Sequence, residues 1–231
     1  MVQELLLRLA ESHHGLLERC VVTHNLPALA LEPPPGGWPF PVVELFNPVP
    51  IGFGANHNRA FMHCNSAYFC VLNPDVELAS PQIWEQLMRD VSVPGVGLAY
   101  PRVLNPDGTT QDNEREAVTP AALLRRHLLR QGTRRIDWVS AAFWLVPASV
   151  YRRLGGFDAR YFMYCEDVDF CLRLRLQGLT LRRTEVSVVH DASRGSRRQL
   201  RHFVWHVCSL LRLWVRPPLW RYRAATALMV D

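Results

Sequence analysis

Apolar residues recur along the chain in two spacings, and these predict alternating helices and strands. Tyr68–Leu72 (YFCVL) is a continuous apolar run of the kind found in a parallel strand covered on both faces. Gly95–Tyr100 and Trp138–Val146 have the same character and are also predicted as buried strands. Near the start, the segment VQELLLRLAESHHGLLERC favours one helix, followed by a strand at Cys20–Thr23; the helix carries leucines at positions 5, 6, 9, 16 and 17.

The clearest helical signal lies between Glu166 and Gly178. Its apolar positions form one buried stripe at helical spacing, and Gly178 is a natural helix end. Upstream, Pro147 followed by ASVYRRLGG predicts a short helix with proline in its first turn. Downstream, the apolar run VSVVH leads to His190. The stripe consists of Val168, Cys171, Leu172 and Leu176.

Four carboxylates gather around the start of this helix: Asp158, Glu166, Asp167 and Asp169. Acids at a helix N-terminus lie in the positive field of the helix dipole, so we expect Glu166 and Asp167 to be ionised near neutral pH. Such a carboxylate can act as a general base, hold a cation or simply cap the helix.

A second acidic position follows the apolar run at Tyr68–Leu72. Pro74 cannot donate to a sheet ladder, so the strand must end at Asn73-Pro74-Asp75. In open α/β sheets the carboxyl ends of strands line the ligand crevice. Asp75 is therefore placed where a hard cation and a phosphate could meet, although an aspartate after proline is also an ordinary turn residue.

Length and composition fit a single intracellular domain. The 231 residues can bury one α/β core. The six cysteines are scattered and are expected to be reduced core residues. We see no signal peptide and no apolar run of about 18 residues, so the expected location is the cytoplasm, with peripheral contact at the inner face of the cell membrane.

The basic residues, all 26 of them arginine, are concentrated late in the chain. Arg194, Arg197, Arg198 and Arg201 precede HFVWHVCSLLRLWVRPPLW, in which tryptophans alternate with further arginines. This pattern suits a helix lying on an anionic membrane, and a core-packing helix with a solvated basic side fits it equally well. Nucleic-acid binding is not expected, because no recognised binding module accompanies the charge.

Five motifs occur together and in order: NPVPIGFGANHNRA, FCVLNPDVEL, GVGLAYPRVLNPDG, DWVSAAFWLVPASVYRRLGGFDARYFMYCEDVDFCLR and VVH. In this order they resemble family 2 glycosyltransferases of the GT-A fold, and most closely the bacterial rhamnosyltransferase-like branch that builds cell-surface polysaccharides. The resemblance runs from Val21 to Trp214. It implies one α/β domain over residues 1–214, with a mixed, mostly parallel sheet flanked by helices, and a basic amphipathic helical segment over residues 194–231.

The resemblance also implies roles for matching residues. Asp75 stands at the last position of the family's metal-binding acidic motif and Asn73 at its first, while His190 matches a late metal-site histidine. Asp167, with Glu166 beside it, matches the base that deprotonates the acceptor hydroxyl. The cofactor expected is Mg²⁺ or Mn²⁺, because both suit carboxylate and phosphate oxygens. Without the resemblance, a histidine that ends an apolar run would more readily be interpreted as a structural residue than as a metal ligand.

Two further segments are implicated by the resemblance. Gly52, Gly54, Asn56 and Asn58 match the segment that contacts the donor nucleotide, although the glycines also suit a turn into a helix. Residues 112–133 match a segment facing the acceptor, with a solvated charged face as the alternative. That segment is flanked by Arg125, Arg126, Arg130, Arg134 and Arg135.

The implied activity is inverting transfer of a sugar, with rhamnose as one option, from a nucleotide-diphosphate donor to a hydroxyl of a polysaccharide or lipid-linked acceptor. One departure stands out. The family opens with a Val/Ile-rich central strand, whereas this chain starts at Met1 in the first helix. Loss of that strand would leave two neighbouring strands with unpaired backbone groups. Either translation starts upstream or the copy is degenerate.

Two other classes of function remain open at this stage. A catalytically degenerate domain would serve as a binding or partner subunit. A metal-dependent phosphohydrolase would also place acids at strand ends, but it should need more metal ligands than Asp75 and His190.

Overall fold

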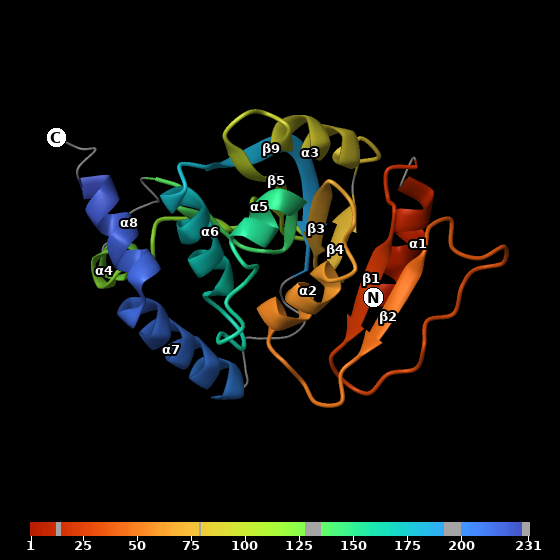
Figure 1. Ribbon diagram of the computed structural model, residues 1–231, viewed down its shortest axis with the longest axis horizontal. Helices are drawn as coiled ribbons and strands as arrows, with labels where there is room; N and C mark the ends of the chain where they lie inside the picture. Colours follow the sequence, from red (N-terminus) through yellow and green to blue (C-terminus); the bar gives the residue numbers. More distant parts are fainter. Residues whose placement is uncertain (13–14, 79, 128–134, 192–199, 228–231) are drawn as a thin grey trace.

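The computed structural model describes residues 1–12, 15–78, 80–127, 135–191 and 200–227. Figure 1 shows a single α/β body in which the two-stranded sheet formed by Cys20–His24 and Val42–Phe46 stands beside the central sheet. The helices are α1 (Val2–Ser12), α2 (Phe53–Phe61), α3 (Ile83–Val91), α4 (Pro120–His127), α5 (Ala148–Arg153), α6 (Glu166–Leu176), α7 (Leu200–Val215) and α8 (Pro217–Ala227). The strands are β1 (Cys20–His24), β2 (Val42–Phe46), β3 (Tyr68–Leu72), β4 (Val76–Leu78), β5 (Val96–Leu104), β6 (Glu114–Arg115), β7 (Trp138–Val139), β8 (Phe143–Pro147) and β9 (Thr180–His190).

The central sheet has five strands in the order β3-β8-β5-β9-β4. It is mixed: β5 and β9 are parallel, and the other neighbours are antiparallel. Side chains of β8 alternate between the two faces, because Trp144 and Val146 join one core cluster while Phe143 and Leu145 join the other. Helix α3 packs against β5 and β9, and α6 packs against β7 and α8.

Most expected elements are present, with three corrections. Tyr68–Leu72 is a strand, but it pairs with β8 in antiparallel orientation, because an apolar run reports burial of both faces and not pairing direction. The run Trp138–Val146 is two strands, β7 and β8, separated at Ser140–Ala142. The first helix ends at Ser12, so Leu16 and Leu17 lie beyond it.

Strands β1 and β3 are edge strands of two separate sheets. Among the described residues, β1 pairs only with β2 and β3 pairs only with β8. A cavity of about 510 Å³ lies between them, lined mainly by apolar side chains from α1, β1, α2 and β3. Figure 1 shows the β1–β2 pair standing beside β3 and β4.

Candidate active site

The start of α6 is built on an unusual backbone turn. Tyr164 and Cys165, the two residues before the helix, have φ angles of 71° and 64°, in the left-handed region. Such a conformation costs about 1–2 kcal/mol per non-glycine residue, so surrounding contacts must hold it. Two contacts from α7 do so: Ser209 Oγ donates to the Met163 carbonyl at 2.7 Å, and the Tyr164 hydroxyl lies 2.9 Å from His202 Nδ1.

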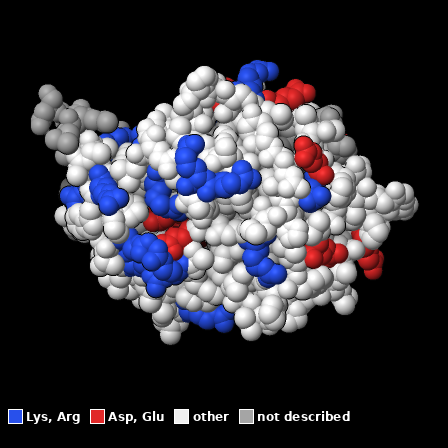
Figure 2. All heavy atoms as spheres, viewed as in Figure 1, with Lys and Arg blue, Asp and Glu red and all other residues white. Residues whose placement is uncertain are grey.

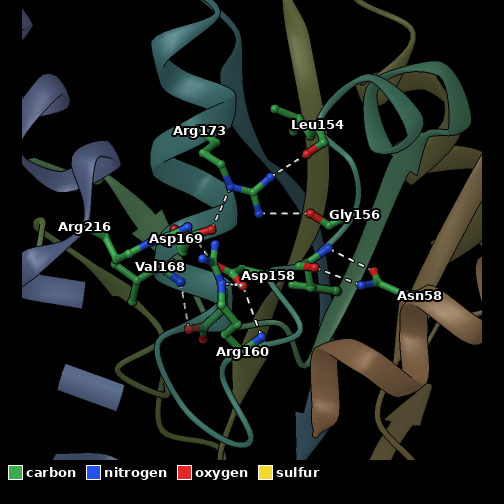
Figure 3. Close-up of polar contacts among 11 residues, drawn as sticks. Asn58, Leu154, Gly156, Asp158, Arg160, Val168, Asp169, Arg173 and Arg216 are labelled. Carbon is green, nitrogen blue, oxygen red and sulfur yellow. Dashed lines mark hydrogen bonds and ion pairs between the residues drawn. The ribbon is translucent and has the colours of Figure 1, made fainter. Parts of the chain in front are cut away.

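Arginines neutralise two of the four clustered carboxylates. Asp169 is bound by Arg173 at 2.6 Å, and the same guanidinium donates to the carbonyls of Leu154 and Gly156. Asp158 is bound by Arg160 and Arg216. Figure 3 shows these pairs tying α6 to the loop that precedes it. Asp158 and Asp169 are therefore structural, which leaves Glu166 and Asp167 for chemistry.

The two remaining carboxylates differ in their surroundings. Glu166 is buried, and its Oε2 atom has no hydrogen-bond partner among the described residues. Burial and the neighbouring Asp167 charge raise the pKa of Glu166 to about 8. Asp167 is partly exposed; burial raises its pKa to about 6, while the Val168 amide and the Arg115 charge hold it lower than burial alone would.

These pKa values correct one expectation from the sequence. Both carboxyls were expected to be ionised by the helix dipole near neutral pH, but burial outweighs the dipole at Glu166. The pair therefore shares its proton unequally, with Glu166 holding it and Asp167 ionised. Asp167 is thus the accessible base, and Glu166 is its neutral neighbour.

The raised pKa of Glu166 predicts a pH-dependent stability. The unfolded value is near 4.5 and the folded value about 8, so the stabilising protonated state is present below pH 4.5 and is lost as the pH rises through 8. Glu166→Gln removes this loss. We expect its melting temperature, relative to the wild type, to rise between pH 5 and pH 8, at about 2–4 °C for each 1 kcal/mol. The control is Glu85→Gln on exposed α3 surface; an equal difference at both pH values would contradict the prediction.

Asp75 and His190 are far apart in sequence but meet at the β4 edge of the central sheet. β4 pairs with β9 so that Val76 lies opposite His190, and the Asp191 amide donates to the Asp75 carbonyl at 3.3 Å. Asp75 Oδ1 lies 3.2 Å from His190 Nε2. This is ion-pair distance, yet Asp75 Oδ1 is buried and receives no hydrogen bond. The two atoms therefore lie close together without forming a hydrogen bond to each other.

Gln111 determines which nitrogen of His190 carries the proton. Its amide nitrogen donates to Asn105 Oδ1 at 3.0 Å and to the His190 carbonyl at 3.3 Å. Its carbonyl oxygen consequently faces His190 Nδ1 at 2.9 Å, so Nδ1 must be the donor. In the neutral ring Nε2 is then an unprotonated lone pair directed at Asp75, an arrangement that a cation would satisfy.

The distance between these two atoms also fits a shared cation. Ligands at right angles around an octahedral cation with bonds of about 2.1 Å lie about 3.0 Å apart, close to the 3.2 Å between Asp75 Oδ1 and His190 Nε2. No group of three or more His, Cys, Asp or Glu side chains suited to a metal is found within the described ranges. A cation held here would need further oxygen ligands from a bound phosphate group.

One short segment links the Asp75 turn to Asp167. The Asn73 amide donates to the Ala142 carbonyl at 2.9 Å. The Ala141 backbone, one residue earlier, lies close enough to the Asp167 carboxylate to lower its pKa. Ala141 and Ala142 directly precede β8, and Phe143, the first residue of β8, pairs with Leu72, the last residue of β3. The structure therefore brings Asn73, Asp75 and Asp167 to the same end of the sheet.

The GFGANHN segment forms the start of α2, where it packs closely against the loop before α6. A Cβ added at Gly52 would lie 2.6 Å from the Tyr161 carbonyl oxygen, and one at Gly54 would lie 2.5 Å from Phe157 Cβ. Only glycine permits this approach. Asn58 bonds both the amide and the carbonyl of Phe157, at 2.9 and 2.8 Å (Figure 3). These contacts are structural, so a role in nucleotide contact stays a prediction for Gly52, Gly54 and Asn58.

Asn56 belongs to a chain of amides that sequence reasoning did not find. Its Oδ1 atom accepts from Asn47 at 2.7 Å, and Asn47 also donates to Asn25 at 2.9 Å. Asn25 and Asn47 directly follow the parallel strands β1 and β2, so the chain lies at the carboxyl ends where α/β sheets bind ligands. A polar residue close behind an apolar strand pattern was the available signal, although only the strand at Cys20–Thr23, and not β2, was predicted from the sequence.

The surroundings of Asp167 include residues that the sequence analysis also missed. Arg115 lies close enough to lower the pKa of both Asp167 and His206, and its guanidinium lies 5.5 Å from the Trp138 ring centroid. His206 comes from α7 and packs against Tyr164, with ring centroids 5.0 Å apart. Helix α7, read from the sequence only as a basic helix, therefore contributes to the wall beside the base.

The arginines flanking residues 112–133 are partly paired. Arg125 forms an ion pair with Glu116, and Arg135 binds Asp137 at 2.6 Å. Arg126 lies in α4, where only the backbone is described, and Arg130 and Arg134 fall outside the described residues, as do Arg194, Arg197 and Arg198. Contact of this segment with an acceptor stays a prediction.

Comparisons with known proteins place these features in context. No protein-family model matches the chain. It is 41% identical over 83 residues to rhamnosyltransferase WbbL of Escherichia coli, covering 35% of this chain and 31% of that protein. It is 29% identical over 186 residues to the N-acetylglucosaminyl-diphospho-decaprenol L-rhamnosyltransferase of Mycobacterium tuberculosis, covering 68% of this chain and 61% of that protein. The chain thus spans about a third to three-fifths of the length of these curated relatives.

A solved structure shows the fold. The chain superposes on GalNAc-T7, crystallised with UDP, GalNAc and Mn²⁺, with a TM-score of 0.53 and 16% identity, over 77% of this chain and 36% of that one. At this identity the likeness concerns the fold alone, which is that of the GT-A glycosyltransferases. The GT-A fold expected from the sequence is confirmed, but the central sheet is not mostly parallel, since one of its four strand pairings is parallel and three are antiparallel.

Proposed function

We propose that this chain, a relative of rhamnosyltransferases with the GT-A fold, transfers a sugar from a nucleoside-diphosphate donor to an acceptor hydroxyl. Rhamnose is the proposed sugar, and a cell-surface glycan or its lipid-linked precursor is the proposed acceptor. The observation that carries this proposal is the convergence of a partly exposed base, Asp167, with the Asp75–His190 pair at one end of the sheet.

Asp167 has the properties that a general base for a sugar hydroxyl needs. Burial raises the pKa of its carboxyl to about 6, so it is ionised at neutral pH yet more basic than an ordinary aspartate. The Val168 amide donates to its Oδ1 atom at 2.8 Å and orients the carboxylate. Glu166, neutral and buried behind it, adds no competing negative charge. Asp167 can therefore accept the acceptor proton as the hydroxyl attacks the anomeric carbon.

Asp75 and His190 are proposed to hold a divalent cation, Mg²⁺ or Mn²⁺, with the histidine nitrogen favouring Mn²⁺. When bound, such a cation offsets the negative charge that develops on a departing diphosphate. Asp75 supplies a buried oxygen without a hydrogen bond, and His190 supplies the nitrogen that Gln111 leaves unprotonated. Asn73 contributes its backbone amide to the turn that presents Asp75.

A single accessible base, with no second carboxylate placed as a nucleophile in the described part of the chain, supports inversion at the anomeric carbon. The test is transfer from a nucleoside-diphosphate rhamnose, measured with and without a sugar-alcohol acceptor, with the anomeric configuration of the product determined by NMR. Acceptor-dependent product of inverted configuration is expected. Donor hydrolysis at an equal rate without acceptor would indicate a phosphohydrolase instead.

One observation favours the alternative of a binding or partner subunit. The unpaired edges of β1 and β3 and the cavity between them lie next to the Asn25–Asn47–Asn56 chain, at the proposed nucleotide end. A partner subunit that has lost donor binding would not bind a nucleoside diphosphate in the presence of Mn²⁺. Calorimetric titration of UDP and other nucleoside diphosphates with Mn²⁺ separates the two functions, and we expect binding.

Gln111 is proposed as a positioning residue for His190. Gln111→Leu removes the acceptor opposite Nδ1, so the ring loses its fixed tautomer and orientation. Loss of such a hydrogen bond to a ligand histidine typically weakens metal binding about 10–100-fold, and we expect this for Mn²⁺ measured by calorimetry. Gln111→Glu keeps an acceptor at that position and should retain affinity, whereas Gln86→Leu on α3 is the matched remote control. Equal affinity in all variants would remove Gln111 from the site.

The chain is also proposed to act as a peripheral protein at a membrane surface, where lipid-linked acceptors are held. In the part of the chain that the structure describes, no helix is both long and apolar enough to cross a bilayer. Support comes from the excess of arginine over acidic residues toward the C-terminus, since this composition favours an anionic surface.

A further inference from the structure

The outward face of α7 is apolar. Six side chains spaced at three- and four-residue intervals along this helix are exposed to solvent, with exposed fractions from 36% for Val207 to 78% for Val215. No other chain segment covers them among the described residues. A contiguous apolar stripe of this kind on a helix marks an interaction site. We call this set the outer face of α7: Leu200, Phe203, Val204, Val207, Leu211 and Val215.

Three other side chains of α7 point the other way, toward the protein. Ser209 and Leu213 are buried, and Trp205 stacks near Phe162 with ring centroids 4.7 Å apart. From the sequence, a helix with its tryptophans and arginines on a membrane and a core-packing helix with a solvated basic side fitted equally well. The structure instead places Trp205 against the body and leaves aliphatic residues outside, which reverses the usual pattern of a surface helix.

Positive charge flanks the outer face. Arg201 and Arg212 are exposed and, being about three turns apart, lie on one flank of α7. Arg221 and Arg223 are exposed on the following helix, α8. Residues 200–227 contain no aspartate or glutamate. Figure 2 shows basic side chains gathered over the left side of the molecule, where α6 to α8 lie in Figure 1, and most visible acidic side chains toward the other end.

We infer that the outer face of α7 inserts into the interface of an anionic lipid bilayer, with Arg201 and Arg212 at the headgroups. An apolar face beside a row of cations, without acidic residues, is complementary to acyl chains beneath phosphate groups. Trp220 of α8, half exposed and covered on one side by Arg223, lies in the same segment and is suited to the headgroup level.

This orientation deepens the proposed function, on which it rests. The inner side of α7 contacts the loop that leads into Glu166 and Asp167, through Ser209 to Met163 and His202 to Tyr164. A helix is about 10–12 Å across. Insertion of its outer face therefore holds the start of α6 about one helix diameter above the bilayer. A hydroxyl on a sugar that is joined to a lipid would be presented at that height.

The test is co-sedimentation of the full chain with vesicles, without donor or metal. We expect binding to vesicles containing phosphatidylglycerol, weaker binding to pure phosphatidylcholine, and a decrease with added salt. Leu211→Glu should weaken binding at least about tenfold, because it removes an inserted apolar side chain and adds a like charge to the surface. Arg201→Gln and Arg212→Gln should each weaken it about fivefold. Leu29→Glu, on an exposed side chain in the loop between β1 and β2, is the matched control and should bind as the wild type does.

Three results would overturn the inference. The first is no binding to anionic vesicles at low salt, and the second is binding that Leu211→Glu leaves unchanged. The third is a dimer, seen in sedimentation velocity, that Leu211→Glu dissociates, because the outer face of α7 would then bind a second copy of the chain. Failure of the proposed function is a separate outcome: it would abolish transfer to a water-soluble acceptor without affecting vesicle binding. Leu211→Glu should keep transfer to that soluble acceptor, because Leu211 does not contact the site.

Discussion

Asp167→Asn is expected to lower turnover by about 10²–10⁴-fold, the usual range for loss of a general base. Asparagine keeps the shape of the side chain and an oxygen that can accept from the Val168 amide, but it cannot take the acceptor proton. Donor affinity should change little, because the Asp167 carboxylate accepts from the Val168 amide and its pKa is influenced by Arg115 and the Ala141 backbone, none of which is proposed to hold the donor. The measurements are steady-state transfer rates and calorimetric donor binding on the same preparations.

The pH profile gives this prediction a second readout. A base must be deprotonated to act, and burial raises the pKa of Asp167 to about 6, so the wild-type rate should fall as the pH drops through about 6. The residual activity of Asp167→Asn should lack this acidic limb. Glu166→Gln should cost far less than Asp167→Asn at neutral pH, because Glu166 already carries its proton there. An equal loss of donor affinity and turnover in Asp167→Asn would assign Asp167 to a structural or metal-binding role.

Local patterns in the sequence were sufficient to place the α6 region. The apolar stripe from Val168 to Leu176 and the glycine at 178 predict the helix observed at Glu166–Leu176. The same reading placed all four carboxylates together but could not rank them. Their different roles come from Arg160, Arg173 and Arg216, one of which is far away in sequence, and from burial that only the folded chain creates.

Features that depend on pairing between distant segments were not readable. The antiparallel orientation of β3 depends on its partner β8, and an apolar run is compatible with either direction. The orientation of α7 was also hidden, because a helix with apolar residues on more than one side does not reveal which side the body will cover. Gln111 lies only one turn after NPDG, yet its link to His190 spans 79 residues and appears only when β9 passes beside it.

The convergence of Asp75 and His190 is the clearest case in which the sequence and the structure agree. They are far apart in the chain, and the resemblance alone joined them; the structure brings their side chains to 3.2 Å through the pairing of β4 with β9. That agreement concerns position. The proposed cation is tested by measuring Mn²⁺ binding, for which the second large effect is expected.

Asp75→Asn and His190→Ala are each expected to abolish tight Mn²⁺ binding in the presence of a nucleoside diphosphate and to lower turnover by about 10²–10³-fold, the usual cost of removing one preorganised charge-stabilising group. Asparagine preserves the turn after β3, so its effect reports the lost charge and not a lost fold. Mn²⁺ binding is measured from the electron paramagnetic resonance signal of the free ion, independently of activity. Glu77→Gln, two residues along on β4, is the matched control, since the Glu77 side chain is exposed and pairs with Arg8 instead. Unchanged Mn²⁺ affinity in both site variants, with melting temperatures equal to the wild type, would show that Asp75 and His190 do not hold the cation and that any cation is held elsewhere.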